Sequence, residues 1–253
     1  MLRPNSNSAV EESTRVRKKG ETFVAFADTV ASRVLEMAGG ESDVVVCIDA
    51  PIFGVDAAIA RRPIEAVFQR KPFSTSKHWA GVQPNNPQGI RETVELGRLV
   101  VAALEQQLGA LWHPDPAAAI REGTKRIVAE TYPTLALALL SPLQPLVARR
   151  RWFSLYGQPY ALMRALEAAR DHGHLGQLFP AEVVAEMADE QLVQRNRDKD
   201  HVAAITSAFL ADALARGRSS VFWCADGHYV LPHRDCWHPD WTVDEVDGVA
   251  VSE

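Results

Sequence analysis

Two short runs of apolar, largely β-branched residues constrain the fold most, because each ends in a carboxylate that is followed closely by a proline. The first run is Val44–Ile48, followed by Asp49, and the second is Arg126–Glu130, which ends in Glu130 itself. Continuous β-branched runs are typical of strands that are buried on both faces of a parallel sheet. Ligands of open α/β sheets bind at the carboxyl ends of such strands. The sequence therefore predicts that Asp49 and Glu130 lie side by side at one functional edge.

The segments around these strands predict an α/β fold. Apolar spacing predicts a helix over 22–38, ended by Gly39 and Gly40, and a second helix over 87–108. A third helix is expected near 202–215, and a hairpin over 220–231. Helix–strand units that feed one sheet indicate parallel neighbouring strands.

The length of 253 residues suits a single α/β domain, which we place at 21–240. Residues 1–20 are polar and charged, without a strand pattern, and are expected to form an N-terminal arm. A mostly helical insertion is expected over about 143–189, where prolines and a glycine interrupt the pattern. Residues 241–253 are expected to be an acidic C-terminal tail.

Composition limits the cellular compartment and the partners that we expect for the protein. The formal net charge of −5 argues against a strongly basic surface, although a local basic groove would still bind nucleic acid. The cysteines are odd in number, and Cys47 falls inside a predicted buried strand, which favours reduced thiols in the cytoplasm. We find no apolar stretch long enough to span a bilayer and no signal-peptide pattern, so no membrane partner is expected.

Four tetrapeptides occur in a fixed order along the chain: Ile-Asp-Ala-Pro at 48–51, Arg-Pro-Ile-Glu at 62–65, Glu-Thr-Tyr-Pro at 130–133 and Asp-Lys-Asp-His at 198–201. In order and spacing they resemble a family of bacterial and archaeal proteins of unknown function that are described as predicted RNase H-like nucleases. The resemblance implies an RNase H-like mixed sheet flanked by helices. It also implies cleavage of nucleic acid with divalent metal ions.

The chain departs from that family in two places. RNase H-like chains begin with a three-strand meander whose first strand carries an aspartate at the centre of the metal site, and residues 1–20 show no such strand. The N-terminal strands are therefore expected to be truncated or diverged, leaving the strand at 44–48 with an open edge that a second copy or another partner would cover. In the last helix, Ala203 stands where family members often have an aspartate, and Asp200 is the best substitute.

Phosphodiester cleavage by such enzymes uses two Mg²⁺ or Mn²⁺ ions about 3.5 to 4 Å apart, held by carboxylates. The resemblance implies Asp49, Glu130 and Asp200 as catalytic metal ligands, with Asp198 as a further ligand. The structural alternative is that a carboxylate at a strand end faces solvent or caps the next helix. Helix capping is also the alternative for Asp198 and Asp200.

Three further residues are candidates for binding the substrate. Arg62 would hold a phosphate through two hydrogen bonds, and Glu65 would orient it or bind metal. A simple surface ion pair between them is the alternative, because they lie one helical turn apart. Tyr132 would stack on a base, or else pack as a ring with a hydrogen-bonded hydroxyl.

Two other patterns have weaker implications. Arginines next to aromatic residues at 149–153, and the basic run at 15–19, would grip single-stranded nucleic acid or form solvated surface. Cysteines and histidines gather near the C-terminus: Cys224, His228, His233, Cys236 and His238. Four of them would suffice for tetrahedral Zn²⁺, but their spacing matches no recognised finger, so zinc is not expected.

The sequence thus predicts an RNase H-like protein whose function is metal-dependent hydrolysis of nucleic-acid phosphodiesters, with Mg²⁺ or Mn²⁺ as cofactor. Whether catalysis survives is left open by the sequence. The alternative is a non-catalytic nucleic-acid-binding or scaffold protein that has lost the metal site. Nothing in the chain distinguishes DNA from RNA as the partner.

Overall fold

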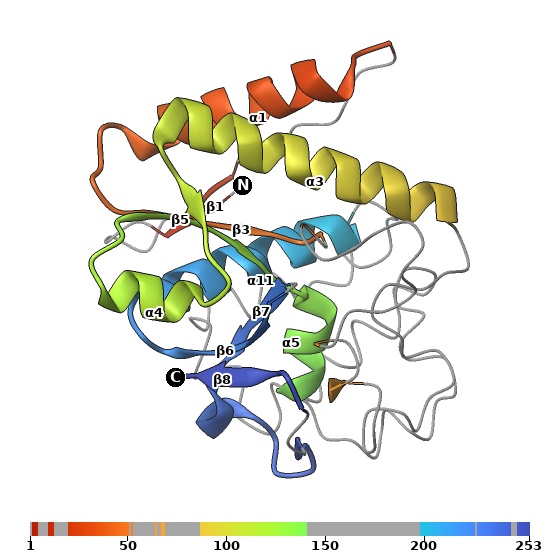
Figure 1. Cartoon of the computed structure of the whole chain (residues 1–253), viewed down its shortest axis with the longest axis vertical. Helices are drawn as coiled ribbons and strands as arrows, with labels where there is room; N and C mark the ends of the chain where they lie inside the picture. Colours follow the sequence, from red (N-terminus) through yellow and green to blue (C-terminus); the bar gives the residue numbers. More distant parts are fainter. Residues whose placement is uncertain are drawn as a thin grey trace.

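The computed structural model describes residues 2–4, 10–12, 20–50, 52, 64, 67–68, 87–140, 198–225, 227–243 and 247–253. These residues form a mixed α/β arrangement with a parallel sheet and an antiparallel sheet, both flanked by helices (Figure 1). The predicted α/β class is therefore confirmed.

The parallel sheet has the strand order β3-β5-β4. Strand β3 (Val44–Ile48) and strand β5 (Arg126–Glu130) have the bounds that the sequence predicts, and their register pairs Ile48 with Glu130. Strand β4 (Leu111–Trp112) pairs with β5 on its other side and was not predicted, since two residues are too few to form a pattern. Strand β3 thus lies at the edge of this sheet.

Helices α1 (Phe23–Ala38) and α3 (Pro87–Leu108) lie together on one face of the parallel sheet, as Figure 1 shows, and both match their predicted positions. Thr22 caps α1, because its Oγ1 accepts a hydrogen bond from the backbone N–H of Ala25. Gly39 ends the helix with a φ of 58°, a left-handed conformation that glycine adopts without strain.

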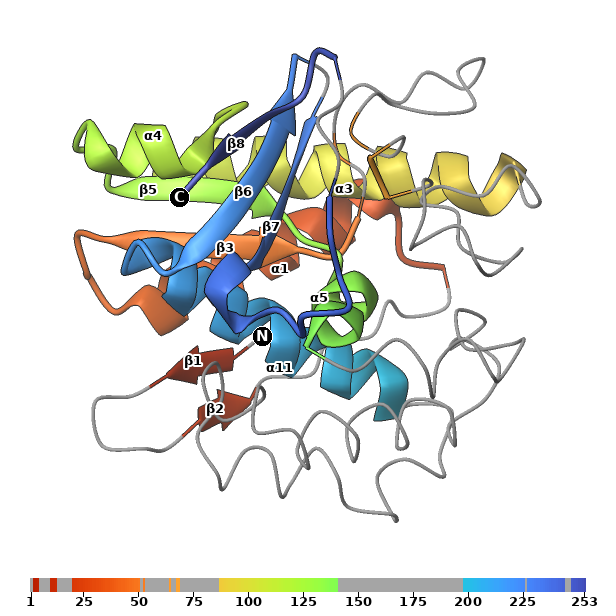
Figure 2. The same cartoon turned by 90° about the horizontal axis from the view of Figure 1, so that it is seen from below.

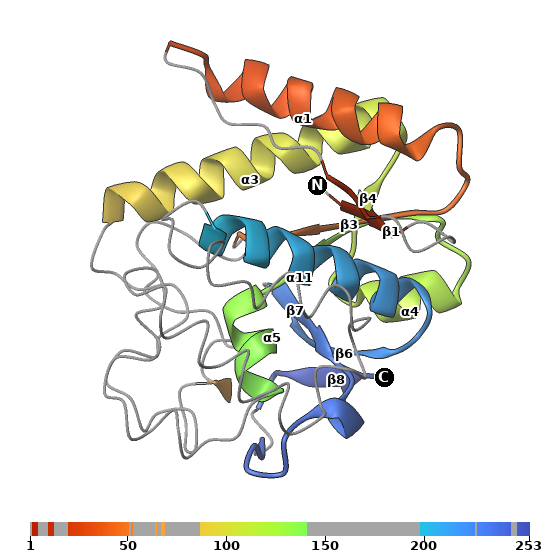
Figure 3. The same cartoon turned by 180° about the vertical axis from the view of Figure 1, so that it is seen from behind.

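Helix α11 (Asp198–Ala215) packs against the opposite face, where Figure 3 shows it in front of β3. It begins four residues before the predicted start. Helix α5 (Pro133–Leu139), which was not predicted, lies beside it. The sheet therefore separates two buried clusters. One includes Ala31, Leu104 and Val128 on the α1 and α3 side, and the other includes Ile127, Leu135 and Leu210 on the α11 side.

The antiparallel sheet has the order β7-β6-β8 and is seen best in Figure 2. Strands β6 (Ser219–Cys224) and β7 (Gly227–Pro232) form the predicted hairpin, and the 3₁₀ turn Arg234–Cys236 follows. Strand β8 (Ala250–Ser252) pairs with β6, so the expected acidic tail contributes a strand instead. A parallel bridge between Thr131 and Val230 joins the two sheets.

The short helix α4 (Pro116–Arg121), which was not predicted, lies near β5. Asp115 caps it by accepting a hydrogen bond from the N–H of Ala118 through Oδ1 at 3.0 Å. The second carboxylate oxygen of Asp115 accepts a hydrogen bond from Ser252 Oγ in β8. Asp115 therefore connects this helix to the C-terminal strand.

The expectation that residues 1–20 contain no strand was wrong. Strands β1 (Leu2–Pro4) and β2 (Val10–Glu12) pair with each other, and β1 lies against α11. These strands are three residues each and contain few apolar residues, so sequence pattern alone gives no signal for them. The predicted helical insertion over 143–189 lies outside the described residues.

Candidate functional site

The carboxyl ends of β3 and β5 meet at one edge of the parallel sheet. Register pairs Ile48 with Glu130, and the N–H of Thr131 donates to the carbonyl oxygen of Ile48 at 2.9 Å. Asp49 is the next residue after Ile48. The prediction that Asp49 and Glu130 lie at the ends of neighbouring strands is therefore confirmed.

Glu130 is almost completely buried, with 1% of its surface exposed. Its Oε2 accepts a hydrogen bond from the backbone N–H of Ile52 at 3.1 Å, and Arg98 Nε donates to the carbonyl oxygen of Ile52 at 3.1 Å. The N–H and C=O groups of Ile52 are thus both hydrogen-bonded to side chains. Glu130 consequently fixes the course of the chain just after Asp49.

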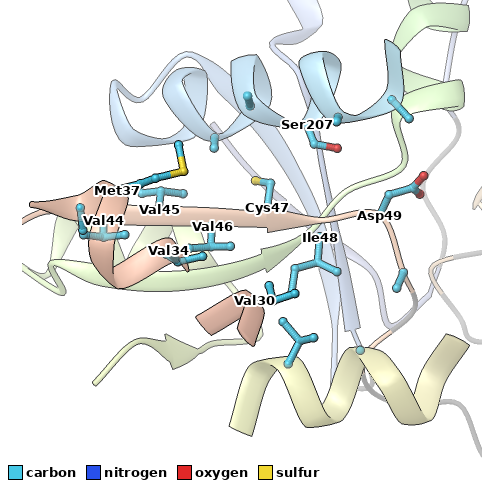
Figure 4. A pocket seen from close by; sticks show the side chains of 18 of the residues that line it. Val30, Val34, Met37, Val44, Val45, Val46, Cys47, Ile48, Asp49 and Ser207 are labelled. Carbon is cyan, nitrogen blue, oxygen red and sulfur yellow. The ribbon is translucent and has the colours of Figure 1, made fainter. Parts of the chain in front are cut away.

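Asp49 and Glu130 leave the sheet on opposite faces. Val44, Val46 and Ile48 pack with the cluster on the α1 and α3 side, and Glu130 shares the face of its register partner Ile48. Asp49 alternates to the α11 side, and Figure 4 shows its carboxylate directed that way. We expected these two carboxylates to hold one cation, whereas their side chains point toward opposite faces of the sheet.

The helix start that faces Asp49 carries the other predicted ligands. Asp198 and Asp200 lie in the first turn of α11, although their side chains are outside the described part of the structure. Asp49 and the α11 residues Ala203 and Ser207 line the same groove, which places the exposed carboxylate beside the amino-terminal half of this helix.

The predicted substrate-binding residues have different outcomes. Arg62 and Glu65 lie outside the described residues, although Ile64 between them is fully buried. Tyr132 is half-buried and packs against the core, with its ring 5.8 Å from that of Tyr229 at an angle of 48°. The ring of Tyr132 therefore packs in the protein, as in the second of the two roles considered for it. The basic segments at 15–19 and 149–153 also lie outside the described residues.

His228 is a structural residue that sequence reasoning did not connect to this site. It is fully buried, and its Nε2 accepts a hydrogen bond from the backbone N–H of Glu130 at 2.8 Å. Its ring stacks on Trp112, with 5.5 Å between centroids and 21° between planes. Only the approach of β7 to the end of β5 creates this contact, so no local signal in the sequence could reveal it.

The Cys and His residues near the C-terminus are spread over separate surroundings. Cys224 Sγ donates to the carbonyl oxygen of Gly227, while His233 and His238 accept from backbone N–H groups two residues further along the chain. Across the part of the chain that the structure describes, no three His, Cys, Asp or Glu residues gather in a way that could hold a metal ion.

A groove of about 710 Å³ runs along the open edge of β3. The described residues of its lining come mainly from α1, β3, α3 and α11. Figure 4 shows Val30 and Val34 on one side of the strand and Ser207 on the other. Its described lining includes the acids Glu41, Asp43, Asp49 and Asp212 and no lysine or arginine.

One thiol lies in this groove. Burial raises the pKa of the Cys47 thiol far above its ordinary value of 9.0. The side chain packs against the α11-side cluster, so the thiol is protonated at neutral pH. Cys47 is therefore an apolar lining residue and a poor nucleophile.

Comparison with known families adds one finding. A family model described as "Protein of unknown function (DUF429)" matches residues 9–226. The chain belongs to the DUF429 family. Neither the curated proteins nor the solved structures gave a match. No helix among the described residues is long and apolar enough to cross a membrane. Membership of DUF429 assigns no activity to the chain.

Proposed function

We propose that this protein is an RNase H-like, cytoplasmic enzyme that hydrolyses nucleic-acid phosphodiesters with Mg²⁺ or Mn²⁺. The observation that supports the proposal most is the position of Asp49. It is an exposed carboxylate at the end of a parallel strand, and it faces the helix whose first turn contains Asp198 and Asp200. Carboxylates from a strand end and a helix start are suitable oxygen ligands for hard divalent cations.

In this proposal Asp49 and Asp200 hold the cation, and Asp198 is a further ligand. When bound, the cation would activate a water molecule and stabilise the leaving oxygen of the phosphodiester. Arg62 is the proposed phosphate-binding residue, since a guanidinium matches the geometry of phosphate oxygens.

Glu130 is a positioning residue in this proposal. Its carboxylate accepts from the N–H of Ile52 and so holds the segment that follows Asp49. The substitution Glu130→Gln keeps an oxygen that can accept this hydrogen bond, whereas Glu130→Ala removes it. We therefore expect metal binding to survive the first substitution.

Calorimetric titration with Mn²⁺ tests the site. We expect the intact chain to bind Mn²⁺, and Asp49→Asn and Asp200→Asn each to abolish binding. Glu130→Gln should retain it. Asp43→Asn is the matched control, because Asp43 is an exposed acid just before the other end of the same strand. Binding that survives Asp49→Asn, or no binding by the folded chain, would exclude the proposed site.

Activity is tested separately on single-stranded DNA, RNA and RNA–DNA hybrids. We expect Mn²⁺-dependent cleavage that Asp49→Asn abolishes. A second candidate function is non-catalytic nucleic-acid binding, which is favoured by the burial of Glu130 and its use in holding Ile52. Binding of the same nucleic acids in the presence of EDTA, without cleavage when Mn²⁺ is supplied, would select this second function.

A further inference from the structure

The turn that carries Asp49 is held on both sides by contacts with other elements. Before the turn, the carbonyl oxygen of Ile48 accepts a hydrogen bond from the chain just after β5 at 2.9 Å. After the turn, the N–H of Ile52 donates to Glu130 Oε2 and its carbonyl oxygen accepts from Arg98 Nε, both at 3.1 Å. Asp49 therefore lies between two backbone positions that hydrogen bonds hold in place.

The side chain of Ile52 is held as well. It is fully buried and belongs to the cluster on the α1 and α3 side, together with Val101, Leu104 and Val128. A closely packed interior leaves such a side chain little freedom to shift. Ile52 is consequently an anchor for the chain that leaves the parallel sheet at Asp49.

Arg98 reaches this anchor from helix α3, 46 residues further along the chain. Val94 and Val101 lie about one helical turn before and after Arg98, and both are buried, so the core holds this part of the helix. A guanidinium is always charged, and a charged donor forms a stronger hydrogen bond to a carbonyl oxygen than a neutral donor does. Arg98 therefore ties Ile52 to an element that is itself fixed.

We propose that Arg98 is a positioning residue for the cation that Asp49 binds. With Glu130 it holds Ile52, and in this way it fixes the direction in which the chain and the carboxylate of Asp49 leave β3. Arg98 contacts neither the cation nor the substrate, because it acts through the backbone. Contacts that orient metal ligands typically contribute about tenfold to hundredfold to metal affinity. This inference rests on the proposed metal-dependent function.

The charge of Arg98 gives the proposal a distinctive sign. A positive charge near a cation site opposes cation binding, so removing the charge alone would leave the Mn²⁺ affinity unchanged or raise it. Losing a contact that positions Asp49 lowers the Mn²⁺ affinity instead. Substitutions that separate the charge from the hydrogen bond therefore distinguish the two effects.

Two substitutions of Arg98 make this separation. Arg98→Gln places an amide N–H where Arg98 Nε lies, since both nitrogens are the fourth atom of the side chain, and it removes the charge. Arg98→Met places a methyl group there and removes both the donor and the charge. Arginine, glutamine and methionine have similar helix propensities, so α3 is preserved.

Calorimetric titration with Mn²⁺ compares these variants. We expect the affinity of Arg98→Gln to stay within about threefold of that of the unchanged protein, and the affinity of Arg98→Met to fall at least about tenfold. An equal loss in both variants would show that the hydrogen bond to Ile52 is not the cause and would overturn the proposal.

Arg121→Met is the matched control. Arg121 also donates from a helix to a backbone carbonyl oxygen, that of Glu253 at 3.0 Å, but this contact holds the end of the chain after β8. We expect Arg121→Met to bind Mn²⁺ as the unchanged protein does. A loss as large as that of Arg98→Met would mean that any such contact affects binding through general stability, which would overturn the specific role of Arg98.

Hydrogen exchange measures the anchor without any metal. The amide of Ile52 should exchange at least about tenfold faster in Arg98→Met and at nearly the unchanged rate in Arg98→Gln. The amide of Thr131 is the internal reference, because its hydrogen bond to Ile48 joins β5 to β3 without Arg98. Unchanged exchange at Ile52 in Arg98→Met would overturn the proposal.

The two measurements separate this inference from the proposed function. If the unchanged protein binds no Mn²⁺, the proposed function fails, and the role of Arg98 at a cation site fails with it. If the unchanged protein binds Mn²⁺ and Arg98→Met binds it equally well or better, only the role of Arg98 is overturned. Weaker binding and faster exchange at Ile52 in Arg98→Met, both restored in Arg98→Gln, would establish the proposal.

Discussion

Glu130 and Asp49 occupy adjacent strand ends but have opposite surroundings. Glu130 is buried and holds a backbone N–H group, whereas Asp49 is exposed at the end of a groove. Buried polar groups are tolerated when hydrogen-bonded and cost free energy when a partner is removed. The two carboxylates should therefore affect stability differently.

We expect Glu130→Ala to lower the free energy of unfolding by about 2 to 4 kcal/mol, because it leaves the N–H of Ile52 without its acceptor and creates a cavity. Glu130→Gln should cost less, since its amide oxygen replaces Oε2. Asp49→Ala should change stability by under about 0.5 kcal/mol, as expected of an exposed residue. Urea unfolding measures all three. Equal losses for Glu130→Ala and Asp49→Ala would contradict the structural role of Glu130.

The raised pKa of the Cys47 thiol predicts how the stability of the protein depends on pH. Because burial raises the pKa of Cys47 above its ordinary value of 9.0, the folded state binds this proton more tightly than the unfolded state. The contribution of this thiol to the free energy of unfolding is complete below pH 9.0 and is lost as the pH rises above 9.0. The urea midpoint of the unchanged protein should therefore fall more steeply above about pH 9 than that of Cys47→Ala. Parallel pH profiles of the two proteins would show that the thiol titrates normally in the fold.

At the scale of secondary-structure elements, β8 is held by contacts from distant parts of the chain. Arg121 donates to the backbone carbonyl of Glu253 at 3.0 Å, and Ser252 Oγ donates to the capping residue Asp115. The Nε1–H of Trp223 in β6 also donates to Ser252 Oγ at 3.2 Å. The C-terminal strand therefore closes one edge of the antiparallel sheet through side chains as well as backbone pairing.

Asp115→Ala should lower the free energy of unfolding by about 2 to 3 kcal/mol, because it removes a helix cap and a part-buried hydrogen bond from Ser252. Thr22→Ala is the matched control, since Thr22 is an exposed cap with a single backbone bond. It should cost only about 1 kcal/mol. A double-mutant cycle of Asp115→Ala with Ser252→Ala should show coupling between the two residues, and additive losses would mean that their contact contributes nothing.

At the scale of the whole molecule, strand β5 separates two hydrophobic cores. Ile127 and Ala129 belong to the cluster on the α11 side, and Val128 belongs to the cluster on the α1 and α3 side. A strand that contributes to both clusters links their stability. The two cores should therefore unfold in one transition.

Leu104→Ala and Leu210→Ala each empty space in a different core, where both side chains are fully buried. Each should cost about 2 to 5 kcal/mol. Because the sites lie on opposite sides of the sheet without shared contacts, the losses should add in the double variant within about 0.5 kcal/mol. Urea unfolding followed by both fluorescence and circular dichroism measures this. Two separate transitions would show that the cores are independent domains.

Elements with long or repetitive sequence patterns could be predicted without the structure. The sequence predicted the bounds of β3, α3 and β5 and the end of α1 at Gly39, because β-branched runs, apolar spacing and a glycine stop are local signals. It also placed Asp49 and Glu130 at neighbouring strand ends. The strands of two or three residues, β1, β2, β4 and β8, were beyond it, since only partners distant in the chain define such short strands.

The direction and the contacts of each strand-end side chain depend on how the elements pack together. Two carboxylates at adjacent ends look equivalent in the sequence, but alternation directs Asp49 toward α11, while Glu130 lies in the interior with Ile52 and His228. The open edge of β3 depends in the same way on strand order. The physical reason is that propensity and periodicity are properties of neighbouring residues, whereas burial, hydrogen-bond partners and free edges arise from contacts between distant segments.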